Sequence, residues 1–436
     1  MYTALPQVTR WIRIIVCSVL LCALFAASGC RKKGAGIEVP FWHAMGGEVG
    51  SALEEMVADF NASHPGPPVM PVSMGSYESL SQKLMASVAA GEPPVLAQVY
   101  ESWSAQFMAS GAVMPMGPYV RGSEGLDPQE LDDIFPVLIE GNTWQEELWT
   151  FPFNKSVPAF FYNRDMFREI GLDPDRFPET WDEFVHTARR LTRDLDGDGR
   201  TDRWGFAMPV NVWIFGCLLL GNGGALLSPD GTEAAFDGPA GVDALEKIAK
   251  LLKEDRVAYL TTGYQHQDDF LAGKVGMIQS SIASYAFMKS KITFDIGIAP
   301  FPATEERAVL VYGTNVALFA RSTPEQRDRA WEFVRWFTSP EAQARWSLAT
   351  AYVPVRRSAL ELPAMSGWFE ELPGLRETML QMEHGRLEPR IQEWFAGRRL
   401  LGELALEPVL RGHETPELGL KKAARHFDAE LEAARR

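Results

Sequence analysis

Residues 37–60 read IEVPFWHAMGGEVGSALEEMVADF, a strand, a glycine turn and a helix in direct succession. The apolar stretch at 37–42 has the composition of a strand, and Gly46-Gly47 interrupts it. Apolar residues then recur at helical spacing, which predicts an amphipathic helix; they are Val49, Leu53, Met56, Val57 and Phe60. This unit indicates an α/β protein.

The same alternation of strands and helices continues along the chain. Apolar runs predict further strands at 69–73, 95–99, 156–162, 274–280, 294–302 and 309–320. Helical spacing predicts helices at 80–88, 241–253, 325–337 and 415–436. Thr180 and Glu183 form a capping box, which predicts one more helix running to Leu191. Residues 117–148 show no regular pattern and are expected to be irregular. Strands that alternate with helices at this spacing favour an α/β architecture.

The N-terminus has the pattern of an export signal. Two arginines precede an apolar run at 14–27, and small residues lead to Cys30. The run is shorter than the ~20 apolar residues that a membrane-spanning helix needs. We expect a lipoprotein signal peptide over 1–29, a lipidated Cys30, and a tether over 30–36. The alternative is an ordinary signal peptide in which the cysteine is incidental.

Composition bounds the partners and the covalent chemistry. Removal of the signal leaves enough of the 436 residues for two domains. A formal net charge of −15 argues against nucleic acid and against broad adhesion to anionic lipid. Of the four cysteines, Cys17 and Cys22 would leave with the signal and Cys30 would carry lipid. Cys217 would then be the only cysteine left, so no intramolecular disulfide is expected.

Seven short segments, in order along the chain, carry a family resemblance. They are Pro40-Phe41-Trp42-His43, Phe60-Asn61, Tyr162-Asn163 with Phe167 and Gly171-Leu172, Pro178 to Phe184, Phe270 to Lys274, Thr338 to Gln343, and Tyr352-Val353-Pro354. Together they resemble the extracellular solute-binding proteins of carbohydrate ABC importers, the maltose-binding-protein-like group. Within that group, the segments 39–45, 75–78, 98–101 and 152–158 are most similar to the glycerol-3-phosphate-binding members.

The resemblance implies two α/β lobes joined by a hinge, a periplasmic-binding-protein-like fold of class II type. We expect the N-terminal lobe to comprise 37–150 and 303–350, and the C-terminal lobe 151–302 and 351–436. A small-molecule ligand, a polyol phosphate or a sugar, would bind in the cleft between them. The closed form would then engage the permease subunits of an ABC importer. The resemblance also implies a monomer without a cofactor, located outside the cytoplasm in the periplasm or at the cell surface.

Several residues are candidates for ligand contact from their place in the chain. Glu101 follows a strand, where open α/β sheets bind ligands, and its carboxylate can accept hydrogen bonds from neighbouring hydroxyls of a polyol. Tyr77 offers a ring and a polar tip, Ser156 and Ser281 lie at strand ends, and Gly313 lets the backbone approach a ligand closely. The alternatives are that Glu101 is a solvated acid in a loop, that Tyr77 is a packing aromatic, that the two serines are ordinary strand-end residues, and that Gly313 is a bulge or turn glycine.

Three further positions are implied by the resemblance alone. Trp213 and Tyr352 match binding positions of the family, and Arg399 matches the arginine that the family directs at phosphate. Arg398 lies beside it, so the assignment is open by one position. The glycerol-3-phosphate binders carry a Trp-x-x-Trp pair whose first ring is replaced here by Val210, which favours a larger ligand such as a glycerophosphodiester.

A separate acidic segment resembles a calcium-binding loop. Its acids lie at positions 1, 3, 5 and 9 of the loop, with glycine at 6; they are Asp194, Asp196, Asp198 and Asp202. The twelfth position is Gly205, so the bidentate glutamate is absent. A structural calcium ion and a plain acidic turn are both open interpretations.

The chain contains no Gly-x-Ser-x-Gly or His-Glu-x-x-His sequence and no phosphate-binding glycine-lysine loop. The leading prediction is therefore a binding component without catalytic activity, specific for glycerol 3-phosphate or a glycerophosphodiester. The alternatives are an oligosaccharide binder of the same importer class and, from another class, a secreted glycerophosphodiester hydrolase. The hydrolase would need clustered carboxylates or histidines around the site.

Overall fold

The computed structural model describes residues 37–435, and the chain divides by its internal contacts into 1–38 and 39–436. The first sheet of the second unit has six strands in the order β2-β1-β3-β14-β4, with β7 also paired to β14. They are β1 (Val39–His43), β2 (Val69–Ser73), β3 (Leu96–Val99), β4 (Val113–Met114), β7 (Phe151–Ser156) and β14 (Tyr312–Phe319). β1 is parallel to β2 and β3, whereas β14 is antiparallel to β3, β4 and β7.

The second sheet has five strands in the order β10-β9-β11-β8-β12. They are β8 (Pro158–Asn163), β9 (Trp204–Pro209), β10 (Ala258–Thr261), β11 (Val275–Ser281) and β12 (Ile296–Ala299). β9 is parallel to β10 and β11, and β8 is antiparallel to β11 and β12. Two short pairs complete the strands, β5 (Thr143–Trp144) with β6 (Glu147–Leu148) and β13 (Val309–Leu310) with β15 (Gly385–Arg386).

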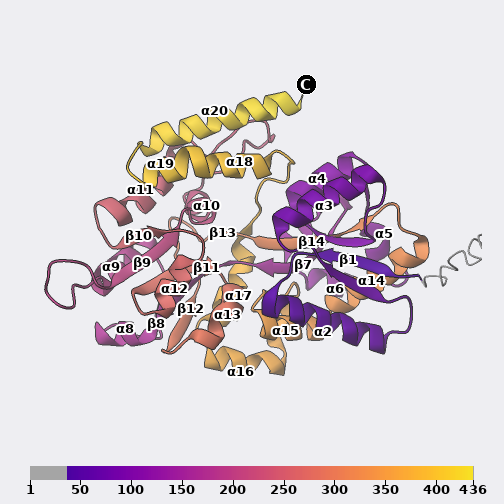
Figure 1. The fold of residues 1–436 in the computed structure, drawn as a ribbon, viewed down its shortest axis with the longest axis horizontal. Helices are drawn as coiled ribbons and strands as arrows, with labels where there is room; N and C mark the ends of the chain where they lie inside the picture. Colours follow the sequence, from indigo (N-terminus) through magenta and orange to yellow (C-terminus); the bar gives the residue numbers. More distant parts are fainter. Residues whose placement is uncertain (1–36, 436) are drawn as a thin grey trace, which may run out of the picture. The chain divides into compact units, whose positions relative to one another are not determined.

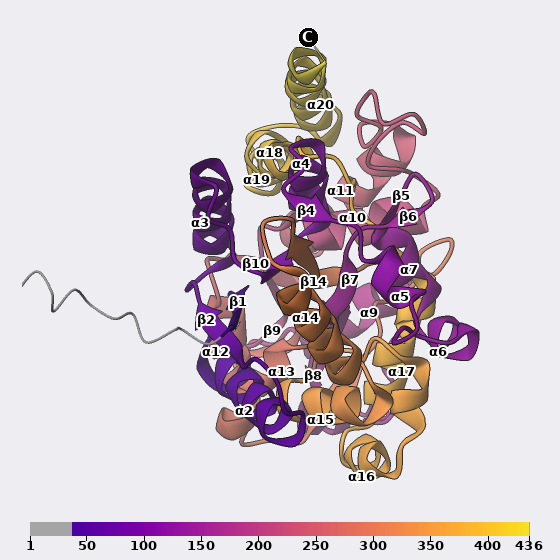
Figure 2. The same ribbon diagram turned by 90° about the vertical axis from the view of Figure 1, so that its right-hand side faces the viewer.

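Helices cover both faces of each sheet (Figure 1). Around the first sheet lie α2 (Gly47–Ser63), α3 (Tyr77–Ala90), α4 (Glu101–Ala109), α14 (Pro324–Phe337) and α15 (Pro340–Thr350). Figure 2 shows α3 and α4 on one side of this sheet and α2 and α15 on the other. The two sides have separate apolar cores, because Phe41 of β1 packs among α2 and α14 side chains whereas Trp42 packs beside Leu80 and Trp103.

The second sheet is covered in the same manner by helices that share one apolar core. They are α9 (Trp181–Leu191), α10 (Val212–Gly221), α11 (Pro239–Lys253), α18 (Trp394–Leu401) and α20 (Pro416–Ala434), whereas Phe270 of α12 (Gln265–Leu271) belongs to the other core cluster, which also contains Phe41. Thr180 and Glu183 make both bonds of the predicted capping box, so the predicted start of α9 is confirmed. α10 is buried on nearly every side, and it holds Cys217, whose pKa burial raises to about 12.

Two expectations about the irregular and extended segments are wrong. Residues 117–148 form short helices, α5 (Gly117–Val120), α6 (Pro128–Asp132) and α7 (Pro136–Gly141), because proline at the first or second position starts each one. The single strand expected at 309–320 is two strands, since 309–310 pair with β15 and 312–319 join the first sheet. Gly313 bends the backbone near this change of partner, with a φ of +95°.

The chain passes from the first sheet to the second between Ser156 and Pro158, and β14 returns to the first sheet after β12. The fold is therefore mixed α/β with two sheet-centred lobes, as predicted. The exact lobe boundaries at 150, 302 and 350 stay a prediction. Of the helices between residues 37 and 435, none has the length and apolar character that crossing a membrane requires.

Candidate functional site

Two predicted serines meet where the sheets adjoin. Ser156 ends β7 in the first sheet and Ser281 ends β11 in the second, 125 residues later. Their hydroxyl oxygens lie 2.6 Å apart, so one hydroxyl donates to the other. The structure thus brings these strand ends together at the junction of the lobes, where ligands of two-lobed folds bind.

Glu101 lies beside this junction and is anchored by two donors. It is the first residue of α4, where a carboxylate is favoured by the helix dipole. Lys155 Nζ donates to Glu101 Oε1 at 3.0 Å, and Asn315 Nδ2 donates to the same oxygen at 2.9 Å. The carboxylate is therefore held at the start of a helix, and its predicted role in ligand contact stays a prediction.

Tyr77 belongs to a cluster of tyrosines next to Glu101. Its ring centroid lies 5.1 Å from that of Tyr100, and its hydroxyl accepts from Asn154 Nδ2 at 3.4 Å. Burial raises the pKa of Tyr77 well above its usual value, and the nearby Tyr352 hydroxyl adds to the rise. These phenols therefore stay neutral and act as hydrogen-bonding groups. Tyr100 and Asn154 were missed in the sequence, although Tyr100 directly precedes Glu101.

Tyr352 and Gly313 lie against the same strands. The Tyr352 ring stacks on Trp346 with centroids 5.9 Å apart. A Cβ added at Gly313 would lie 2.0 Å from the Asn154 carbonyl oxygen. The close approach that glycine allows is thus one of β14 to β7, which corresponds to the turn-glycine alternative raised from the sequence. Any contact of Gly313 with ligand stays a prediction.

Trp213 forms an aromatic wall on the second lobe. It follows Asn211, whose side chain caps α10 by accepting from the Trp213 and Ile214 amides. The Trp213 ring lies 5.0 Å from that of Tyr312, the first residue of β14. The Arg398 guanidinium carbon lies 5.5 Å from the centre of the Trp213 ring.

The structure places Arg398, and not Arg399, beside the other candidate residues. Arg398 pairs with Glu388 at 3.2 Å, whereas Arg399 pairs with Glu403 at 3.0 Å on the outer face of α18. The Arg398 side chain is 22 % exposed and that of Arg399 is 59 % exposed. The reason is helical geometry: Trp394 is among the buried residues of α18, and position 398 lies four residues after it, on the same side.

A narrow recess gathers the charged groups of both lobes. The residues that line it are Tyr100, Glu101, Ser102, Glu388, Pro389, Trp394, Phe395 and Arg398. Phe395 of α18 lies 6.4 Å from Trp103 of α4, so the two lobes touch across it. Trp394 Nε1 donates to Glu388 Oε1 at 3.2 Å, which fixes the partner of Arg398 in turn. A carboxylate, a guanidinium and aromatic rings thus face one gap, whose free volume in this structure is only about 10 Å³.

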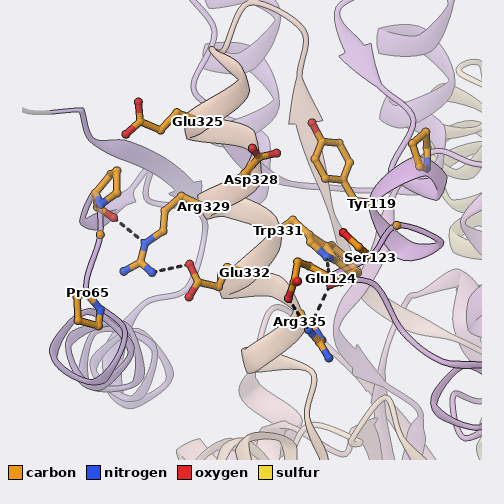
Figure 3. A pocket seen from close by; sticks show the side chains of 14 residues that line it. Pro65, Tyr119, Ser123, Glu124, Glu325, Asp328, Arg329, Trp331, Glu332 and Arg335 are labelled. Atoms are coloured by element: carbon orange, nitrogen blue, oxygen red, sulfur yellow. Dashed lines mark hydrogen bonds and ion pairs between the residues drawn. The ribbon is translucent and has the colours of Figure 1, made fainter.

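A larger hollow of about 560 Å³ lies elsewhere, between α14 and the loops near Pro65 and Tyr119 (Figure 3). Its buried cation is already satisfied, because Arg329 donates to Glu332 Oε2 at 2.7 Å and to the Pro67 carbonyl at 2.8 Å. Neither the predicted site residues nor the aromatic cluster lines it. Size alone therefore does not make it the binding site.

The acidic loop brings together three of its four candidate aspartates. Side-chain oxygens of Asp194, Asp196 and Asp202 lie within 4.8 Å of one another and are exposed, whereas Asp198 is outside this group. Asp194 already accepts from the backbone amides of Gly197 and Gly199, and chiefly the Gly199 amide lowers its pKa. A calcium ion at this loop stays a prediction. The predicted lipidation at Cys30 falls outside the described residues.

The two sheet-centred lobes and the recess between them are the features of a two-lobed binding protein. Residues 46–344 match the family described as bacterial extracellular solute-binding protein, and the chain belongs to that family. It is 27 % identical over 433 residues to the sn-glycerol-3-phosphate-binding periplasmic protein UgpB of Yersinia pseudotuberculosis, covering 95 % of this chain and 96 % of the relative. The Escherichia coli K12 protein of the same name is 28 % identical over 404 residues, covering 88 % and 90 %.

Solved structures agree on the fold. UgpB from Mycobacterium tuberculosis, in complex with glycerophosphocholine, has a TM-score of 0.80 at 22 % identity, covering 92 % of this chain and 100 % of that one. The sugar-binding protein MalE from Xanthomonas citri has a TM-score of 0.77 at 24 % identity, covering 92 % and 98 %. The predicted family and the predicted two-lobed α/β fold are thereby confirmed. The chain is a solute-binding protein of an ABC importer and acts outside the cytoplasm.

Proposed function

We propose that this protein captures a glycerophosphodiester, or glycerol 3-phosphate, in the recess between its lobes. The observation that carries the proposal is that Glu101 and Arg398 line the same recess. A carboxylate accepts hydrogen bonds from the hydroxyls of a glycerol moiety, and a guanidinium fork matches phosphate oxygens. The names of the relatives, which bind glycerol 3-phosphate or glycerophosphocholine, support the same ligand class.

Val210 favours the larger diester over the monoester. It lies two residues before the first residue of α10, in the turn that leads to Trp213, and a valine there leaves more room than a second indole. Isothermal titration calorimetry with glycerophosphocholine and glycerol 3-phosphate tests this preference. We expect the diester to bind more tightly, and Val210→Trp to weaken the diester more than the monoester. Tighter binding of glycerol 3-phosphate by the native protein would reject the diester assignment.

An oligosaccharide is the second candidate, because aromatic rings surround the same recess. Tyr100, Trp394 and Phe395 line it, and such rings present the faces and polar tips that bind sugars. Maltotriose in the same titration separates the two ligand classes, since sugar binding would survive Arg398→Gln and phosphodiester binding would not. A hydrolase is tested by choline release from glycerophosphocholine, which we expect to be absent.

The lipid anchor and the oligomeric state also belong to the proposal. We infer that Cys30 is acylated after removal of 1–29 and that the monomer is held at the membrane near its permease. Labelling of cells with an alkynyl fatty acid tests this: the native protein should carry the label and Cys30→Ser should not. Label that persists in Cys30→Ser would contradict the anchor, and size-exclusion chromatography of the soluble part tests the monomer.

A further inference from the structure

Lys155 is the most deeply buried cation at the binding site. Only 1 % of its side chain is exposed, against 17 % for Glu101. A buried ammonium group requires a charged partner, and Glu101 supplies it at 3.0 Å. Buried pairs of this kind contribute little net stability compared with apolar residues of similar size. The pair therefore calls for an explanation other than stability.

The second donor to Glu101 is itself held in place. Asn315 accepts from Asn142 Nδ2 at 3.0 Å, and Thr150 donates to Asn142 Oδ1 at 2.5 Å. This chain of side chains fixes which way the Asn315 amide faces, so its Nδ2 points at Glu101. Lys155 and Asn315 both bind Oε1 of the carboxylate. Oε2 accepts no hydrogen bond from any residue between 37 and 435.

We propose that Lys155 is a positioning residue that turns Oε2 of Glu101 toward the ligand and thereby sets selectivity for a free hydroxyl group. The inference rests on the proposed function, in which Glu101 receives a hydroxyl of the bound glycerol moiety. With Oε1 held by two donors, rotation of the carboxylate is blocked, and the ligand hydroxyl meets an oriented acceptor. Lys155 does not touch the ligand in this scheme.

The remaining charged groups of the recess are balanced separately. Arg398 is paired with Glu388 at 3.2 Å, and both residues line the recess, whereas Lys155 lies buried behind Glu101 and outside its lining. Removal of the Lys155 charge would leave Glu101 to compete with Glu388 for Arg398, the cation among the residues that line the recess. Both effects would weaken recognition of a hydroxyl, because the carboxylate would no longer be held in a single orientation.

The test compares two ligands that differ by one hydroxyl. Glycerophosphocholine and its analogue without the 2-hydroxyl are titrated against the native protein and Lys155→Met, which keeps the length of the stem. In the native protein, loss of the hydroxyl should weaken binding about 10- to 100-fold, the range for a hydrogen bond to a charged group. In Lys155→Met, loss of the 2-hydroxyl should weaken binding only about threefold or less. If Lys155→Met weakened the binding of both ligands by the same factor, Lys155 would have a merely structural role and the inference would be overturned.

Two further variants keep the result interpretable. Lys274→Met removes an equal charge from a pair of equal length, with Asp269 at 3.0 Å, on an exposed side chain, and should leave the ligand ratio unchanged. In a Glu101→Gln background, Lys155→Met should change the ratio by less than about twofold, because no carboxylate is left to orient. If the native protein binds neither this diester, glycerol 3-phosphate nor maltotriose, the proposed function itself fails. Ligand binding with an unaltered hydroxyl ratio in Lys155→Met would overturn the positioning role alone.

Discussion

Replacement of Arg398 by methionine, set against the same change at Arg399, tests the geometry of the site most directly. The two residues are neighbours on α18 and carry the same charge, so the variants differ only in where the lost guanidinium lay. Arg398 contacts the Trp213 and Phe395 rings at 5.5 Å each and pairs with Glu388. Arg399 makes one exposed pair along the helix surface.

The expected magnitudes follow from these contacts. Two cation–π contacts at about 0.5–1 kcal/mol each, with a half-buried ion pair, give Arg398→Met a loss of about 1–3 kcal/mol in unfolding free energy. Arg399→Met loses about 0.5 kcal/mol or less, because exposed pairs between residues four apart contribute little. For a phosphate-bearing ligand, Arg398→Met should weaken binding about 10- to 100-fold, and Arg399→Met should remain within about twofold.

Calorimetric titration with glycerophosphocholine measures the affinities, and urea denaturation of the same preparations measures the stabilities. The titration is carried out without urea, after circular dichroism has shown that both variants are folded. A result in which Arg399→Met loses tenfold or more in affinity while Arg398→Met stays within twofold would refute the placement of α18. Equal losses in both would mean that the guanidinium acts only through net charge.

Three further predictions concern backbone, acid stability and metal. Gly313→Ala should lower the unfolding free energy by about 3 kcal/mol in urea denaturation, because the added Cβ would meet the Asn154 carbonyl. Gly75→Ala, at a φ of +92° with open space around it, should lose only about 1–2 kcal/mol. Equal losses in the two variants would contradict the close approach of β14 to β7. Burial lowers the pKa of His266 from 6.5 to about 4, so its neutral form contributes stability above pH 6.5 that is lost as pH falls toward 4. Thermal unfolding measured across this pH range should show the loss. An equally steep decline in a His266→Gln variant would exclude His266 as its cause. If the loop at 194–202 binds calcium as weakly as extracellular sites do, roughly 10 mM calcium should raise the melting temperature, and EDTA should reverse the rise. An unchanged melting temperature would contradict calcium binding at this loop.

Local signals in the sequence predicted the elements, and long-range pairing decided the site. The Thr180 capping box and the apolar spacing of α14 act within a few residues, so both helices were predictable. The meeting of Ser156 with Ser281 joins residues 125 positions apart, and no local pattern encodes it. The positions of Ser156 and Ser281 were anticipated, but their direct hydrogen bond was not.

The charged residues show the same division. Glu101 was predicted from its place after β3, but its partner Lys155 was read only as part of a motif, because β7 was not recognised as a strand. β7 is buried along its whole length, so it lacks the alternating pattern that marks a half-exposed strand. The choice between Arg398 and Arg399 depends on which side of α18 is buried, and the helical spacing from Trp394 to Arg398 is the signal that could have decided it.

β14 has a consequence for the order in which the protein can be made. It lies between β3 and β4 in the first sheet and also pairs with β7, although nearly two hundred residues separate it from β4. Until residue 319 has been synthesised, the strands before it lack the neighbour that joins them into one sheet. Contacts so remote in sequence form slowly. The first sheet therefore cannot be completed until most of the chain has been synthesised, which delays folding of that lobe and favours passage through a secretion channel.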